Sequence, residues 1–167
     1  MKGGLEQLRE QMAEYLTACG VPATAAWPAE ERLRREGPVA VVTLKGCQAG
    51  PAGFQSYLGE RYNPESGQWE EIYGRKVRLT FGLDLYAPPQ AGETALQTAL
   101  DALAQACAGA GPEQMSLQEF SSGETAYDKD SRLLRKPAQA LCTVYLYAAR
   151  QADGQFLDFE IRGERIP

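Results

Sequence analysis

Carboxylates offer the most direct chemistry in this sequence, and the segment "DKDSRLLRKPAQ", which begins at Asp128, looks most like a metal site. A calcium-binding loop needs glycine at its sixth position and glutamate at its twelfth. Counted from Asp128, those positions hold Leu133 and Gln139. The segment therefore fails the requirements of a calcium loop, and we expect it to form a solvated turn.

A pair of carboxylates could also act as general acid and base, or as acid and nucleophile. Five acidic residues are candidates for such a pair: Asp84, Glu119, Glu124, Asp158 and Glu160. All of them fall where outward strand positions or loops are expected, and charged side chains are ordinary there. The sequence therefore does not predict a catalytic pair.

The absence of histidine is the strongest chemical fact in the sequence. It excludes Ser-His and Cys-His nucleophile pairs, histidine bases and histidine metal ligands. The cysteines, at positions 19, 47, 107 and 142, are widely spaced and form no Cys-x-x-Cys pair, so no zinc site is predicted. Each lies in or beside an apolar pattern, and we expect buried, reduced thiols. The sequence thus predicts no catalytic residue, no cofactor and no metal.

The overall charge limits the partners that the protein can bind. Lysine and arginine number 17 and aspartate and glutamate 22, for a net charge of −5. An acidic chain without a long basic run is poorly suited to neutralising phosphates, so no nucleic-acid partner is predicted. The first residues, "MKGGLEQLREQ", lack the apolar run of a signal peptide, and no apolar run reaches membrane-spanning length. We therefore expect no membrane association.

Aromatic side chains gather beside two predicted turns. "NPESG", residues 63–67, has strong turn chemistry, with Tyr62, Trp69 and Tyr73 close to it, and Tyr127 precedes the second turn at "DKDS". Aromatic residues are enriched at protein interfaces. They also stiffen hairpins by cross-strand pairing, and both alternatives remain open. The candidate interface residues are Tyr62, Asn63, Trp69, Tyr73, Tyr127 and Arg135.

Periodicity predicts the elements that must position these residues. Helical spacing of apolar residues indicates two helices, and alternating or β-branched runs indicate strands. The expected elements are a helix at 4–19, a strand at 38–47, a hairpin at 54–86, a helix at 94–109, a hairpin at 115–149 and a strand at 155–163. Together they predict an α+β fold. It is one domain, residues 1–167, with a largely antiparallel sheet built from two long hairpins and packed on one face by two helices. The hairpin 54–86 is expected to project.

The stretch "VRLTFGLDL", residues 77–85, shows the alternation most clearly. Every second residue from Val77 to Leu85 is apolar, and Arg78, Thr80 and Asp84 lie among the residues between them. In a strand these two sets point to opposite faces of the sheet. Because the helices would cover the apolar side, we expect the polar side to form an open face.

The order of elements resembles small α+β proteins of tailed bacteriophages and prophages, in the tail terminator and head–tail joining group. An N-terminal helix is followed by "VAVVTL", a hairpin ending in "FGLDLYAP", the helix "ALQTALDALAQAC" and the strands "ALCTVYLYA" and "FLDFEIRG". The resemblance covers nearly the whole chain as an order of elements, without a signature motif.

The resemblance implies a non-enzymatic structural protein. Tail terminators form a hexameric ring that caps the tail tube, stops its polymerisation and offers a surface to the head connector. The expected partners are thus copies of the chain and other phage tail or connector proteins. The expected location is the host bacterial cytoplasm during assembly and then the virion. The alternative is a small-ligand or peptide-binding module that uses the open face of the sheet.

Overall fold

A computed structural model describes residues 4–27, 36–53, 56–151 and 156–163 of the chain. Two α-helices and a series of strands make up this part of the chain. In order they are α1 (Leu5–Ala18), β1 (Ala23–Thr24), β2 (Val39–Pro51), β3 (Tyr57–Asn63), β4 (Gln68–Ala87), a 3-10 turn (Pro89–Ala91), α3 (Gly92–Ala108), β5 (Ser116–Ser122), β6 (Ala126–Asp128), β7 (Leu133–Lys136), β8 (Ala138–Gln151) and β9 (Phe156–Arg162).

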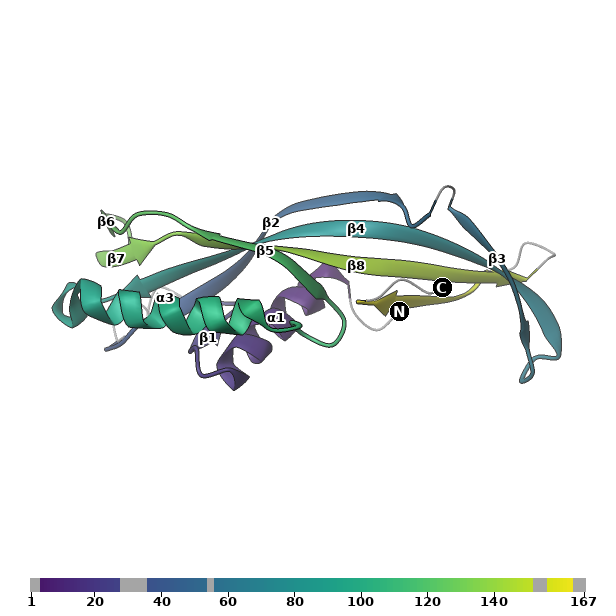
Figure 1. Ribbon diagram of the computed structural model, residues 1–167, viewed down its shortest axis with the longest axis horizontal. Helices are drawn as coiled ribbons and strands as arrows, with labels where there is room; N and C mark the ends of the chain where they lie inside the picture. Colours follow the sequence, from purple (N-terminus) through teal and green to yellow (C-terminus); the bar gives the residue numbers. More distant parts are fainter. Residues whose placement is uncertain (1–3, 28–35, 54–55, 152–155, 164–167) are drawn as a thin grey trace.

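Strand β4, 20 residues long, is the axis of the sheet. One edge of β4 pairs with β2 and β3, and the other edge pairs with β8 and β7. The sheet continues outward from β8 to β5 and β9, from β2 to β1, and from β7 to β6. These strands curl into a half-barrel, with both helices on one side of it (Figure 1).

The predicted sheet of two long antiparallel hairpins is wrong. The sheet is mixed, because β1 runs parallel to β2. Strand β3 pairs only with residues 68–73 of β4, whereas residues 75–82 of β4 lie between β2 and β8. Residues 54–55 of the expected hairpin lie outside the described part. The second expected hairpin is divided, since β5 pairs with β8 whereas β7 pairs with β4. Alternation identifies a strand but does not identify the strand beside it.

Four register shifts, each a β-bulge or a similar irregularity, interrupt the pairing of the described strands and help the sheet to curl. One lies in β2 between Leu44 and Gly46, and another in β5 between Leu117 and Glu119. A bulge places two residues opposite one, which bends the strand and increases its twist. No sequence pattern had indicated any of these shifts.

The two predicted helices form close to the expected positions. The apolar stripe of α1 is buried at Leu8, Met12 and Leu16, and α3 buries Leu96 and Leu103. Thr94 and Gln97 have the residue types and spacing of a capping box, but no such box forms. The helix begins two residues earlier, at Gly92, and its N-cap is Ala91 without a side-chain hydrogen bond.

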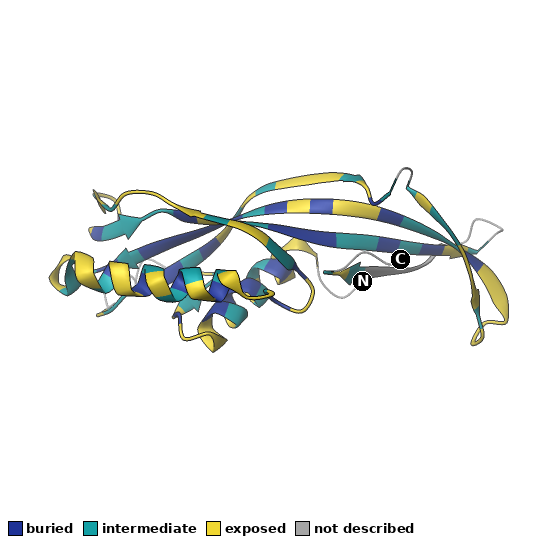
Figure 2. Ribbon diagram, in the orientation of Figure 1, coloured by how far each residue is buried: buried dark blue, intermediate teal, exposed yellow. Residues whose placement is uncertain are grey.

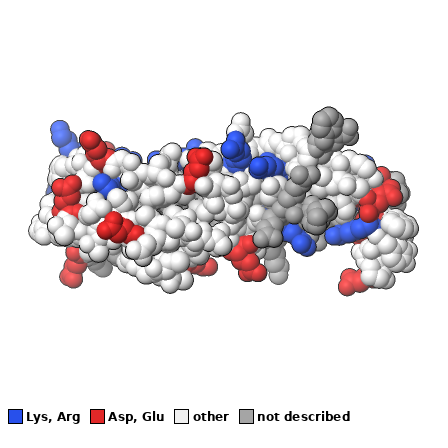
Figure 3. Space-filling model, in the orientation of Figure 1, with Lys and Arg blue, Asp and Glu red and all other residues white. Residues whose placement is uncertain are grey.

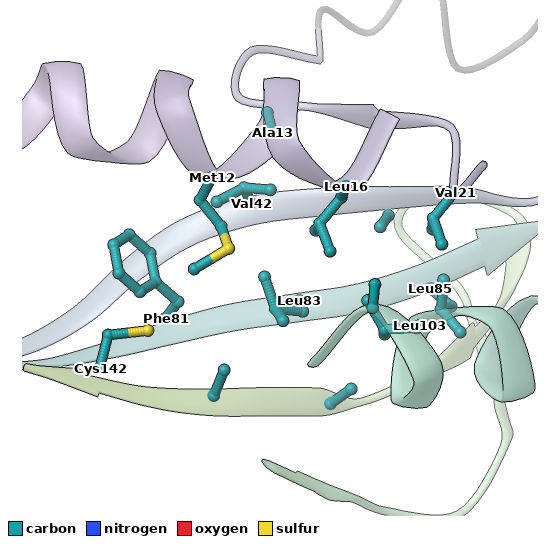
Figure 4. Packing of buried hydrophobic residues seen from close by; sticks show 14 of the residues in the cluster. Met12, Ala13, Leu16, Val21, Val42, Phe81, Leu83, Leu85, Leu103 and Cys142 are labelled. Carbon is teal, nitrogen blue, oxygen red and sulfur yellow. The ribbon is translucent and has the colours of Figure 1, made fainter. Parts of the chain in front are cut away.

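The hydrophobic core lies between the helices and one half of the sheet. Phe81, Leu83 and Leu85 of β4 are completely buried and lie near Met12 of α1 and Leu103 of α3 (Figure 4). Burial of side chains of this size contributes about 1.5–3 kcal/mol each. Buried residues are concentrated where the helices cover the sheet, whereas the end that carries β3 is more exposed (Figure 2).

Candidate functional site

One end of the sheet extends beyond both helices (Figure 1). We call this end the arm: β3, residues 68–74 of β4 and residues 147–151 of β8. Because Val77 and Leu79 point into the core, Trp69, Glu71 and Tyr73 point to the same side of β4. No helix of the described chain covers them there.

Four aromatic rings share this side of the arm, and we call them the aromatic arm face: Tyr57, Tyr62, Trp69 and Tyr73. Tyr57 lies opposite Tyr73 and Tyr62 lies opposite Trp69 in the β3–β4 register. The ring centroids are 5.5 Å and 5.7 Å apart, in edge-to-face geometry. Tyr57, Tyr62 and Trp69 are nevertheless 44%, 53% and 59% exposed. The rings therefore pair across the strands and still present apolar surface to solvent, and the interface role stays a prediction.

A polar network fixes Tyr73 in place. The Tyr73 hydroxyl donates to Glu71 Oε2 at 3.0 Å and accepts from Arg150 Nη2 at 2.6 Å. Arg150 Nε also donates to Glu71 Oε2 at 3.0 Å, and the guanidinium carbon lies 4.8 Å from the centroid of the Tyr73 ring. The hydrogen bond from Arg150 lowers the pKa of Glu71, with Tyr73 as a second donor. The carboxylate therefore stays ionised and holds both partners.

The opposite side of the arm contains a buried carboxylate. Glu70 is 2% exposed and accepts from Asn63 Nδ2 at 2.6 Å and from Arg61 Nε at 3.1 Å. The hydrogen bond from Asn63 lowers the pKa of Glu70, and Arg61 adds to this effect. Asn63 Oδ1 also accepts from the backbone N–H of Glu65 at 2.9 Å. Asn63 was expected at an interface, but its polar atoms are used inside the hairpin.

A small apolar cluster joins the arm to the rest of the sheet. It surrounds Gly74, where a Cβ atom would lie 2.6 Å from Leu58 Cδ1, 3.0 Å from Ala52 Cβ and 3.1 Å from Tyr147 Cε1. Ala52 and Tyr147 are almost fully buried. The close approach of these side chains leaves little room for a side chain at position 74.

The remaining two candidate residues lie at the other end of the molecule, where β6 and β7 are found (Figure 1). Tyr127 in β6 is 53% exposed. Arg135 in β7 donates to Asp84 Oδ2 through Nη2 at 2.7 Å and Nε at 3.1 Å, and this bond raises the pKa of Arg135. The structure therefore divides the six predicted residues between two ends and leaves Arg135 engaged within the fold.

The open face of the sheet carries a shallow depression of about 500 Å³, and Gly46, Gln48, Arg78, Thr80 and Leu141 are among the residues that line it. It lies on the side of β4 opposite the helices, where the alternation predicted an open face but did not indicate a depression. Asp84 lies further along the same face and is only 8% exposed.

Sequence reasoning missed two members of the arm surface. Tyr57 was one of several aromatics near the first turn, but only the register places its ring beside Tyr73. Arg150 contacts Glu71 from a position 79 residues away, and no local pattern connects the two.

The acidic candidates do not form a catalytic pair in the described part of the chain. Asp84 accepts from Arg135 and from the Ala138 backbone N–H at 3.2 Å, and Glu119 and Glu124 are exposed. The side chains of Asp158 and Glu160 lie outside the described part. Among described residues, no group of three or more His, Cys, Asp or Glu side chains could hold a metal ion.

The cysteines agree only in part with the expectation of buried thiols. All are free; Cys142 is buried and Cys107 half-buried, and burial raises their pKa to about 12 and about 11. Cys19 and Cys47 are exposed, so the expectation is wrong for these two.

Within the described chain, neither helix combines the length and the apolar character needed to cross a membrane. No protein-family model matches the chain, and a search of curated proteins finds no match. The surfaces described above therefore carry the functional argument.

Proposed function

We propose that the chain is a non-enzymatic structural protein of a bacteriophage or prophage, a tail terminator or tail-completion component. In this role it self-associates into a ring at the end of the tail tube. The observation that carries the proposal is the aromatic arm face, which extends beyond the helices and exposes three large rings. The order of elements, which resembles that of tail terminators, gives the specific assignment.

The arm is suited to docking because its aromatic side chains are already ordered. Cross-strand ring pairs and the Arg150–Glu71–Tyr73 network hold the face in one conformation. When a partner covers the face, the side chains of the arm therefore lose little conformational entropy. Exposed aromatic rings on a rigid frame supply large apolar contact areas, as at the centres of protein interfaces.

Candidate contact residues at both ends of the long axis suit a head-to-tail assembly. The arm forms one end, and Tyr127 lies at the other. A contact between two different surfaces closes into a ring when the rotation between copies permits. The ring would occupy the end of the tube so that no further tube subunit adds, and it would then meet tail or connector proteins. This proposal places the chain in the host cytoplasm during assembly and then in the virion.

Molar mass in solution tests the proposal directly. Light scattering over a wide concentration range, with electron micrographs of the same sample, should show rings of about six subunits. The double variant Tyr62→Ser/Trp69→Ser should remain folded and lose the rings. Gln97→Ser/Thr98→Ser is the control double variant, because both residues are exposed on α3, outside the arm and outside the surfaces proposed for contact. A strict monomer at every concentration, or unchanged rings in the double variant, would contradict the proposal.

The depression on the open face favours a second candidate, a module that binds a small ligand or peptide there. Arg78, Gln48 and Thr80 supply polar groups around the shallow depression. Such a module would be monomeric and would gain thermal stability when its ligand is added. Thermal unfolding with a ligand library, on a sample already shown to be monomeric, distinguishes it from the assembly subunit.

A further inference from the structure

The helix layer is acidic. Helices α1 and α3 contain five carboxylates, and Arg9 is their only cation. Arg9 pairs with Glu6, whereas Glu10 and Glu14 are exposed and have no ion-pair partner among the described residues. Figure 3 shows basic side chains near the middle of the upper rim, among other places, while acidic side chains are spread over the lower side, the upper left and the right-hand end of this view.

The carboxylates of α1 form one stripe. Residues four apart lie on one side of a helix, so Glu6, Glu10 and Glu14 follow each other along the axis. They point away from the core, which α1 contacts through Leu8 and Met12. Four residues of α-helix rise about 6 Å, which is the spacing between successive carboxylates along the stripe.

The open face of the sheet has cations at a similar spacing. Lys76 and Arg78 alternate with Val77 and Leu79, which are buried, so the two cations point to the open side. Both are exposed, and neither has an ion-pair partner within the described ranges. Two residues of strand span about 6.8 Å, close to the spacing of the α1 stripe.

Beside these cations the open face is hollow. The depression of about 500 Å³ has Arg78 at its side, and Gly46, Thr80 and Leu141 also line it. Gly46 has no side chain to fill the space, and glycine in a strand often marks a place where another chain segment approaches closely. Lys45 does not fill it either, because its side chain crosses Gly82 toward Asp84, with Nζ 3.9 Å from Oδ1.

We propose that the open face of the sheet binds helix α1 of a second copy of the chain, with Glu10 and Glu14 paired to Arg78 and Lys76. Charge complementarity and matched spacing select this occupant. The contact joins two different surfaces, so each copy binds one neighbour through its helix and another through its sheet, as a ring requires. The inference rests on the self-association proposed above and adds a second contact to that of the arm.

Charge reversal tests the pairing. Lys76→Glu/Arg78→Glu and Glu10→Lys/Glu14→Lys should each raise the dissociation constant of self-association about tenfold or more, because each places like charges together. A variant carrying all four changes should recover assembly. The control Glu93→Lys/Asp101→Lys makes the same change of charge on α3 and should assemble normally. Circular dichroism verifies that every variant is folded.

A mixture of the two reversed variants gives a sharper result. Both contacts between unlike variants join opposite charges, so the mixture should recover assemblies in which the two variants alternate, whereas each variant alone assembles weakly. Wild-type assembly should weaken as salt is added, since exposed charges are screened. Assembly that resists charge reversal, or no recovery in the fourfold variant, overturns this inference.

The same data separate the two proposals. Rings that are lost in the arm variant Tyr62→Ser/Trp69→Ser but persist after charge reversal overturn the sheet–helix contact and leave the proposed function standing. A wild-type monomer at all concentrations and salt levels overturns both. A monomer whose open face binds an acidic peptide would instead support the binding module.

Discussion

Strand β4 passes through two contrasting regions, the helix-covered body and the arm. In the body, Phe81, Leu83 and Leu85 lie on the side that the helices cover and are completely buried. In the arm, Trp69 points to the same side of the same strand and is 59% exposed. The alternation of residues is continuous, but the second layer ends before the arm. Whether a strand residue is buried therefore depends on whether another layer covers that part of the sheet, and not on the alternation of residues along the strand.

The two regions are also stabilised differently. The body depends on apolar burial between sheet and helices. The arm depends on cross-strand ring pairs, on the carboxylate networks of Glu70 and Glu71, and on the small cluster around Gly74. Local opening should therefore affect the arm before the body. The following predictions test this contrast, from the largest expected effect to the smallest.

Phe81→Ala should produce the largest loss of stability, about 3–5 kcal/mol, because it removes a completely buried ring from the body and leaves a cavity. Urea-induced unfolding monitored by circular dichroism measures the change in the free energy of unfolding. A loss below about 1 kcal/mol would show that the helix layer does not pack on the sheet as described.

Gly74→Ala should cost about 1–3 kcal/mol, because the added methyl group overlaps Leu58 and crowds Tyr147. Gly50→Ala is the matched control: Gly50 is also a strand glycine, but a Cβ atom there would meet nothing within 4 Å. Hydrogen exchange should show faster opening of the arm in Gly74→Ala and not in the control. Equal effects would mean that the cluster around Gly74 does not hold the arm.

Acid should loosen the arm before the body. Hydrogen bonds lower the pKa of Glu70 and Glu71 in the folded state, chiefly from Asn63 and Arg150 respectively. Their stabilisation is therefore present above the unfolded glutamate pKa of about 4.3 and is lost as pH falls through the folded values. Glu70→Gln should weaken the arm at neutral pH and reduce its sensitivity to acid.

Single-tryptophan variants measure this difference. In the variant Trp27→Phe, the fluorescence comes from Trp69 in the arm. In the variant Trp69→Phe, it comes from Trp27 in the body, whose ring centroid is 5.1 Å from that of Tyr86 at the end of β4. The Trp69 signal should change at higher pH than the Trp27 signal. A common transition for both probes would show that arm and body respond to acid together.

Trp69→Ser should have the smallest effect on the free energy of unfolding, within about 1 kcal/mol, because the exposed ring contributes mainly one cross-strand pair. Tyr73→Ser should cost more, because it removes the hydroxyl that bonds both Glu71 and Arg150. Thermal unfolding of the two variants compares them, and a larger loss for Trp69→Ser would place that ring in a buried contact.

The sequence alone determined the local features of this protein. The spacing of Leu8, Met12 and Leu16 specified a helix with one buried side, and the alternation from Val77 to Leu85 specified a strand with two different faces. Turn chemistry at residues 63–67 specified the hairpin tip, where Asn63 binds the backbone as its type suggests. These features follow from interactions between residues that are close together in the sequence, so the residue pattern of a short segment is sufficient to indicate them.

Only the tertiary structure decided which strands are neighbours and where the helix layer ends. The pairing of Glu71 with Arg150, the parallel β1–β2 contact and the separation of Tyr127 from the arm all depend on residues far apart in the chain. Periodicity gives the faces of a strand but carries no information on its register with a distant strand. For that reason the sequence could not show that the six candidate residues, taken from two predicted turns, occupy opposite ends of the molecule.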